Sequence, residues 1–176
     1  MDEPRARGVS LWLMPEGEAC ERLHGVIAGL ARRFSTPAFP PHLTLLPGIA
    51  GRPEDDLLTA SRRLAGALRP PEIRLSAVEG REEPFRCLFA RAVRDEPLRA
   101  AHAAAARAFG REPDPAFLPH LSLVYGALPA ATKRQVAAEV TPLVGGAFAA
   151  RRLHVWRTDG PVGEWREIGA FDLAGD

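Results

Sequence analysis

The chain has 176 residues, of which 46% are hydrophobic and 26% charged, and its formal net charge is +1. This length suits one domain with a sizeable core, and the composition is typical of globular rather than disordered proteins. The balance of 23 basic against 22 acidic residues argues against a protein that neutralises many phosphates along a nucleic acid. A small anionic ligand fits this charge better.

The first half of the chain predicts strand, helix, strand, helix and strand. Val9, Leu11 and Leu13 alternate with Ser10, Trp12 and Met14, the period of a half-buried strand, and Pro15 ends it. An amphipathic helix and a short strand follow, and then a second helix that ends before Pro70 and Pro71 and a strand over 73–78. The apolar helix faces are Cys20, Leu23, Ile27, Leu30 and Phe34 in the first and Leu57, Ser61, Leu64 and Leu68 in the second.

The second half predicts the same order of elements. Strands are expected over 86–93 and 121–124, with a helix between them whose apolar face is Leu98, Ala101, Ala105 and Phe109. A fourth helix is marked by Val136, Val140 and Leu143. Two closing strands, over 149–157 and 164–173, are joined by a turn at Asp159 and Gly160.

A repeated motif supports a duplicated unit. Residues 37–48 read PAFPPHLTLLPG and residues 115–126 read PAFLPHLSLVYG, a shift of 78 positions without a gap, and eight of the twelve positions are identical. We therefore expect one domain, 1–176, made of repeat units 7–80 and 85–158 and a closing strand. The predicted class is α+β and bilobal, with two lobes related by a pseudo-two-fold axis. Each lobe has an antiparallel-rich sheet that faces a central cleft, with helices outside.

Each copy of the motif places an imidazole and a hydroxyl on one face of a strand. Side chains two positions apart share a face, so His42 and Thr44 point one way while the neighbouring leucines point the other. His120 and Ser122 repeat this arrangement. Because leucines favour a core, the polar pairs are expected to face an opening, and a two-fold relation would bring both pairs to one pocket.

Such a pocket suits in-line attack of water on a cyclic phosphodiester. One neutral and one protonated imidazole can coexist near neutral pH, so one can take a proton from the water while the other protonates the leaving oxygen. Thr44 and Ser122 would donate hydrogen bonds to the non-bridging oxygens. Neither a histidine pair with metal-binding helix spacing nor a cysteine cluster occurs in the sequence, so we expect no metal and no cofactor.

Other polar and aromatic residues are expected to be structural. His24 and His102 also differ by 78 positions, but they lie in predicted helices without a hydroxyl partner and are expected to be solvated. His154 is interpreted as a structural residue of a strand, and Phe39 and Phe117 as plugs of the paired loops.

The cellular setting follows from the N-terminus and the cysteines. Residues 1–8 are charged, and no apolar run approaches the roughly 18 residues that cross a bilayer. Cys20 and Cys87 lie in apolar surroundings and are expected to be buried, reduced thiols. We therefore expect a soluble, cytoplasmic protein without membrane partners, and a monomer.

The paired motifs resemble those of the two-histidine phosphoesterase superfamily and, within it, the plant- and yeast-type cyclic phosphodiesterases. The resemblance extends over most of the chain, through SLWLMP (10–15), FRCLFA (85–90), RTDG (157–160) and EWREIGAFDL (164–173). It implies metal-independent hydrolysis of ADP-ribose 1″,2″-cyclic phosphate or of nucleoside 2′,3′-cyclic phosphates.

The resemblance also implies roles for individual residues. His42 and His120 would be catalytic, with His120 as the base and His42 as the acid, and Thr44 and Ser122 would bind phosphate. Trp12 and Tyr125 correspond to aromatic positions that line the cleft and could stack on a base. For both aromatic residues, packing in the core is an equally open alternative.

Two other functions remain open. An enzyme of the same superfamily that acts on, or ligates, the 2′,3′-cyclic ends of RNA is disfavoured by the near-neutral charge. A non-catalytic nucleotide-binding module would not need both histidine pairs intact.

Overall fold

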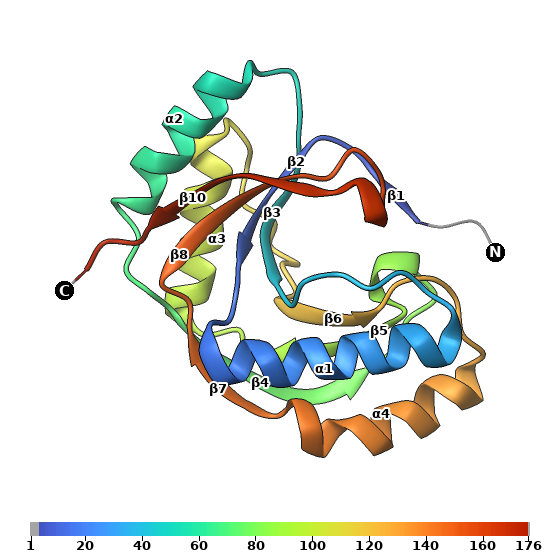
Figure 1. Ribbon diagram of the computed structural model, residues 1–176. Helices are drawn as coiled ribbons and strands as arrows, with labels where there is room; N and C mark the ends of the chain where they lie inside the picture. The colour runs from blue at the N-terminus through green and yellow to red at the C-terminus, as the bar shows by residue number, and fades with distance from the viewer. Residues whose placement is uncertain (1–3, 176) are drawn as a thin grey trace.

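The computed structural model describes residues 4–175 (Figure 1). The order of elements expected for each half of the chain is confirmed, with three short strands in addition, β1, β7 and β9. The elements are β1 (Arg5–Ala6), β2 (Val9–Leu13), α1 (Gly17–Phe34), β3 (Leu43–Ile49), α2 (Glu54–Ala65), β4 (Glu72–Glu79), η1 (Pro84–Arg86), β5 (Leu88–Ala92), α3 (Glu96–Ala108), β6 (His120–Val124), α4 (Ala130–Val144), β7 (Gly146–Ala149), β8 (Arg152–Arg157), β9 (Gly160–Pro161), η2 (Val162–Glu164) and β10 (Arg166–Asp172).

The helices form where the apolar spacing predicts them. α1 buries Leu23, Ile27 and Leu30, which lie on one face because side chains three and four positions apart are neighbours on a helix. α3 begins after Asp95, whose carboxylate accepts a hydrogen bond from the Leu98 backbone N–H at 3.1 Å.

The buried face of α4 differs in one residue from the prediction. Val136, Val140 and Val144 are buried, whereas Leu143 is 52% exposed. The buried valines follow one another at four-residue intervals, so the face turns away from Leu143. The assignment of Leu143 to the apolar face was wrong.

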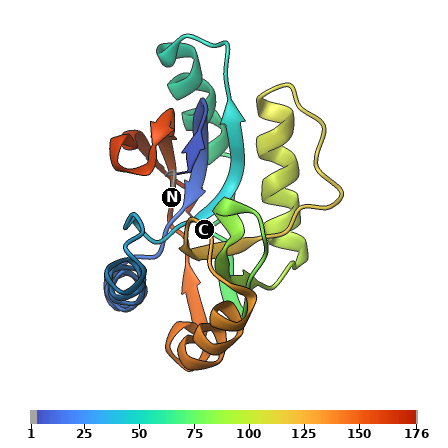
Figure 2. The same ribbon diagram turned by 90° about the vertical axis from the view of Figure 1, so that its right-hand side faces the viewer.

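Eight of the strands within residues 4–175 form one continuous antiparallel sheet, and not the two separate sheets that the repeat suggested. Its order is β10-β8-β2-β3-β6-β5-β4-β7, and β1 and β9 form a small sheet of their own. The predicted α+β class is confirmed. β3 and β6 join the halves of the sheet through a single residue pair, Leu43 and Leu121, so the sheet curls at its centre (Figure 2).

Each half of this sheet contains strands from both sequence repeats. β4, which ends the first repeat, pairs with β5 and β7, and β8, which ends the second, pairs with β2 and β10. The helices follow the same exchange, since α1 packs on β6 and α4 while α3 packs on β3 and α2 (Figure 1). The two repeats are therefore interleaved around the junction of β3 and β6.

The cysteines are both free: Cys87 is buried as expected, and Cys20 is only partly buried. In the described part of the chain, every helix is too short or too polar to span a bilayer.

Candidate active site

The two histidine motifs lie on neighbouring strands. β3 and β6 pair in antiparallel fashion at Leu43 and Leu121, the central residues of the motifs. Both leucines are fully buried, so the residues on either side of them point to the opposite face of the sheet. The same register sets each histidine across from the hydroxyl residue of the other motif. The opposed pairs are His42 with Ser122 and His120 with Thr44.

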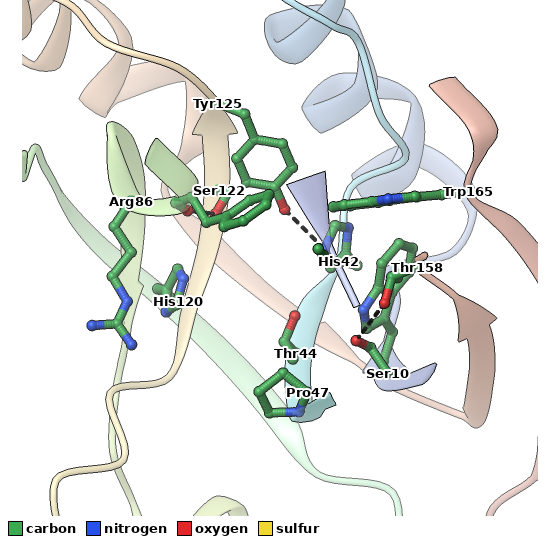
Figure 3. A pocket seen from close by; sticks show the side chains of 13 residues that line it. Ser10, His42, Thr44, Pro47, Arg86, His120, Ser122, Tyr125, Thr158 and Trp165 are labelled. Atoms are coloured by element: carbon green, nitrogen blue, oxygen red, sulfur yellow. Dashed lines mark hydrogen bonds between the residues drawn. The ribbon is translucent and has the colours of Figure 1, made fainter. Parts of the chain in front are cut away.

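A cavity of about 240 Å³ opens over this face of the sheet (Figure 3). All four side chains of the two motifs line it, so the structure brings together the residues that the sequence singled out. The rest of its wall is aromatic, hydroxylic and cationic. These other residues are Ala6, Ser10, Trp12, Pro47, Phe85, Arg86, Tyr125, Thr158 and Trp165.

His42 is held on three sides. Its Nδ1 lies 2.7 Å from the Pro40 carbonyl oxygen, and its ring stacks on Trp12 with the centroids 3.6 Å apart. Because Nδ1 donates to the carbonyl, Nε2 of the neutral ring is an acceptor, and the Tyr125 hydroxyl lies 3.2 Å from it. Burial lowers the pKa of His42 to about 3, outweighing the Pro40 carbonyl, which raises it. His42 is therefore neutral in the ligand-free site.

His120 has the same backbone contact but different neighbours. Its Nδ1 lies 2.8 Å from the Leu118 carbonyl oxygen, and its ring meets the Phe89 ring in a T-shaped contact with the centroids 5.1 Å apart. Burial lowers its pKa, against the Leu118 carbonyl, and the cations Arg86 and Arg81 lower it further. Both catalytic candidates thus have the proton on Nδ1, which leaves Nε2 as an acceptor, and in His42 the Tyr125 hydroxyl contacts this nitrogen.

The two hydroxyl groups differ in the ligand-free site. Ser122 Oγ donates to the Phe85 carbonyl at 3.0 Å, so its single proton must turn before it can reach a phosphate oxygen. Thr44 is half-buried and lines the cavity from β3.

The aromatic candidates Trp12 and Tyr125 line the cavity but are 1% and 4% exposed. Trp12 also stacks on Trp156, with ring centroids 4.5 Å apart. Such burial disfavours base stacking by Trp12, and that role remains a prediction. Trp165 is less buried; its Nε1 donates to the Gly160 carbonyl at 3.2 Å.

Sequence reasoning assigned no role to several residues of the cavity. Arg86 lies beside His120, while Ser10 and Thr158 form a buried hydroxyl pair, 3.1 Å between oxygens, on the far side of His42 (Figure 3). The signal was present, because Arg86, Thr158 and Trp165 lie in the segments FRCLFA, RTDG and EWREIGAFDL that carried the family resemblance. These segments supported the family resemblance, but no site residue was predicted from them.

The remaining histidines are partly as expected. His24 is exposed and His154 is buried, with Nδ1 2.6 Å from a Glu167 carboxylate oxygen. The prediction of a solvated His102 was wrong. Its Nδ1 lies 2.9 Å from the Leu45 carbonyl oxygen, and its Nε2 accepts from the Asp114 backbone N–H at 3.1 Å.

The plugs Phe39 and Phe117 are buried, as expected, at 3% and 9% exposure. Among residues 4–175, no group of three His, Cys, Asp or Glu side chains is arranged to hold a metal ion.

A comparison with family models decides the membership of this chain. Residues 15–161 match the model of the 2′-5′ RNA ligase superfamily. The chain belongs to this superfamily. The 2′-5′ RNA ligase superfamily is one of two-histidine phosphoesterases, so the resemblance seen in the motifs is confirmed at that level.

Solved structures with the fold of this superfamily align over nearly the whole chain. TT0787 of Thermus thermophilus is 25% identical over 96% of this chain and 98% of that chain, with a TM-score of 0.64. E. coli LigT complexed with phosphate is 17% identical over 99% of this chain and 100% of that one, with a TM-score of 0.60. LigT complexed with 3′-AMP is 18% identical over 98% and 100%, with a TM-score of 0.58. Proteins with curated descriptions gave no match of comparable significance.

Proposed function

We propose that this protein is a metal-independent cyclic phosphodiesterase that opens a small nucleotide-type cyclic phosphate to a phosphomonoester. The candidate substrates are ADP-ribose 1″,2″-cyclic phosphate and nucleoside 2′,3′-cyclic phosphates. The observation that supports this most is the pairing of the two motifs at Leu43 and Leu121, with two imidazoles and two hydroxyls around one cavity. Membership of the 2′-5′ RNA ligase superfamily supports it further.

The ligands of a structural neighbour fit this substrate class. LigT has been solved with phosphate and with 3′-AMP. The second ligand is a nucleoside phosphomonoester, which is the class of product that opening a 2′,3′-cyclic phosphate yields.

The two histidines supply both proton transfers of the reaction. Nε2 of His120 takes a proton from water as its oxygen attacks phosphorus, and the bond from phosphorus to one ring oxygen breaks. Nε2–H of His42 gives its proton to that leaving oxygen, which becomes a hydroxyl. Exchange of protons with solvent then returns both rings to their starting states. No Lewis acid is required for this sequence of transfers.

This division of roles follows the family resemblance, and burial lowers the pKa of both histidines in the ligand-free site. Burial, and after it the charges of Arg86 and Arg81, lower the pKa of His120 and so keep it neutral, as a base must be. Burial is the main cause of the low pKa of His42, and the negative charge of a bound phosphate offsets it. The negative charge of the bound substrate raises the pKa of His42, so that His42 takes up from solvent the proton that it later donates.

The hydroxyl groups complete the phosphate site. Thr44 and Ser122 donate to the non-bridging oxygens, Ser122 after turning away from the Phe85 carbonyl. Trp165, at the cavity wall and only partly buried, offers an aromatic face for the base. Trp12 and Tyr125 contribute through His42, which each of them contacts.

The test is a panel of cyclic phosphates whose products are identified by phosphorus NMR, with excess chelator present. His42→Ala and His120→Ala should each lower kcat by at least ~10². His24→Ala, which changes an exposed histidine of α1, serves as the matched control and should leave kcat unchanged. Unchanged turnover in either cavity variant would remove that histidine from the mechanism, and binding without turnover by the unaltered protein would indicate a nucleotide-binding module.

An RNA-end enzyme is the second candidate, because the matched superfamily is named for 2′-5′ RNA ligases. Turnover of a cyclic mononucleotide should be compared with that of an RNA carrying the same end at several salt concentrations. A strong RNA preference with steep salt dependence would favour this second function.

A further inference from the structure

A second hollow adjoins the catalytic cavity on the side of His120. It encloses about 140 Å³. The loop between α3 and β6 forms its outer wall with Arg111, Glu112 and Asp114. Four residues line both spaces, so the hollow and the cavity are direct neighbours. The shared residues are Thr44, Pro47, Arg86 and His120.

This hollow exists because the two repeats differ in one loop. α1 and α3 end alike, each with a left-handed residue, Ser35 (φ 51°) and Gly110 (φ 68°). The next residues, Thr36 and Arg111, each donate a backbone hydrogen bond to the carbonyl five positions earlier. The left-handed residues are 75 positions apart and the motif histidines 78, so the second loop is three residues longer. The extra length forms the outer wall.

Hydrogen bonds of two side chains hold the longer loop against β3. His102 joins them, because its Nδ1 donates to the Leu45 carbonyl while its Nε2 accepts from the Asp114 N–H. Its ring also stacks on Phe117, with the centroids 4.0 Å apart and the planes 2° from parallel. Arg111 Nη1 donates to the Pro47 carbonyl at 2.5 Å. The hollow is therefore already formed without a ligand.

Two guanidinium groups face this space. The hydrogen bond of the Arg111 side chain goes to a neutral carbonyl, and within residues 4–175 no carboxylate lies in ion-pair distance of it. Arg86 pairs at 3.0 Å with Glu83, whose side chain is 56% exposed. Of the two carboxylates in the wall, Asp114 accepts the Ala116 N–H at 2.8 Å, and Glu112 is exposed. The donors of Arg111 thus remain largely available to an anion.

We propose that this hollow binds a second phosphate group of the substrate, carried on the sugar that bears the cyclic phosphate, and that Arg111 and Arg86 hold it. This inference rests on the proposed function. In a nucleoside 2′,3′-cyclic phosphate only the 5′ oxygen of the sugar is free to carry another phosphate. The preferred substrate is accordingly a 5′-phosphorylated one, in which that phosphate is a monoester, part of a diphosphate, or a link to a preceding nucleotide.

The experiment compares kcat/KM for adenosine 2′,3′-cyclic phosphate with and without a 5′-phosphate at one ionic strength. The unaltered enzyme should prefer the phosphorylated substrate about tenfold or more, the effect expected of a charge-assisted hydrogen bond. Arg111→Gln should lower this ratio severalfold, since only Arg86 then remains to hold the second phosphate, and Arg111→Glu should lower it further. Glu112→Gln should raise the ratio, because it removes a like charge from the wall.

The control is Arg107→Gln, which removes an exposed positive charge four residues away, in a different hollow, and should keep the ratio. Adding ADP-ribose 1″,2″-cyclic phosphate and a dinucleotide with a cyclic end identifies the source of the second phosphate. A ratio near one in the unaltered enzyme, or a ratio that Arg111→Gln does not change, overturns the second-phosphate site while leaving cyclic phosphodiesterase activity in place. Absence of turnover on every cyclic phosphate would reject both proposals.

Discussion

His42 and His120 occupy equivalent positions in a repeated sequence, yet they lie in unlike surroundings. Each donates from Nδ1 to the carbonyl two residues before it, so the duplication fixes the same tautomer in both. His42 is enclosed by aromatic rings, whereas His120 lies beside arginines. One source of the difference is visible in the motif, where the second copy has Tyr125 and the first has Pro47. The proposed acid and base therefore share their backbone contacts and differ in the side chains around them.

The largest expected effect tests whether the two histidines act as one unit. Each single alanine substitution should lower kcat by a factor of about 10² to 10⁴. The double variant His42→Ala/His120→Ala should be only slightly slower than the less active of the two single variants. The reason is that both act in the same step, so removing one leaves the other little to do. Single-turnover rates of the four proteins measure this. Losses that multiply in the double variant would mean independent roles.

Two variants separate the structural role of Trp12 from the substrate-stacking role proposed for Trp165. Trp12→Ala should lower the free energy of unfolding by about 3–5 kcal/mol, since Trp12 is 1% exposed and packs on both His42 and Trp156. Trp165→Ala should instead raise KM, because it removes a stacking interaction with the base worth about 1–3 kcal/mol. It should change the stability little. Urea unfolding and substrate titrations separate the two. A stable Trp12→Ala protein with a raised KM would return base stacking to Trp12.

The buried histidine should make stability depend on pH. The pKa of His42 is about 3 in the folded protein against an ordinary 6.5, so the unfolded chain binds more protons between these values. Stability is therefore full above pH 6.5 and falls as the pH is lowered toward 3, by up to about 1.4 kcal/mol per pH unit. The pKa of His120 is also lowered, so His120 likewise reduces the stability as the pH falls. Denaturant unfolding from pH 4 to 7 measures the slope.

His42→Gln should reduce this slope and His24→Gln should not, because His24 is exposed. An equal slope in the protein and in His42→Gln would show that His42 is not held neutral by burial.

The smallest expected effect concerns the contact that distinguishes His42 from His120. Tyr125→Phe removes the hydroxyl 3.2 Å from His42 Nε2 and leaves a buried nitrogen without its donor. The loss should be about 1 kcal/mol in stability, with a kcat reduction of about fivefold. Thermal unfolding and steady-state kinetics measure both. A kcat equal to that of the unaltered protein would make Tyr125 a packing residue only.

Local sequence signals predicted the helix faces and the two motifs, since both depend on spacing along a few turns or one strand. The alternation in residues 9–14 was less informative, because β2 is buried on both of its faces. When both faces of a strand are buried, alternation along the sequence does not show which face lines a cleft and which packs in the core. Trp12 could therefore be assigned to either.

Features that depend on distant segments left no local mark. The exchange of β4 and β8 between the halves of the sheet arises from pairing with strands of the other repeat. The burial of His102 depends on Leu45 and on Asp114, which lie 57 and 12 positions away. On the aromatic side of the site, Trp165 lies against Trp12, which is 153 positions away in the sequence. Contacts between such distant residues could be identified only from the folded structure.

The most direct measurement is a crystal structure with adenosine and vanadate, a mimic of the five-coordinate phosphorus formed during attack. Nε2 of His42 and Nε2 of His120 should each lie within about 3.2 Å of a different oxygen on the same vanadium atom, on opposite sides of it. Vanadate bound to one imidazole alone, or bound outside the cavity, would contradict the central claim that both histidines serve one reacting centre.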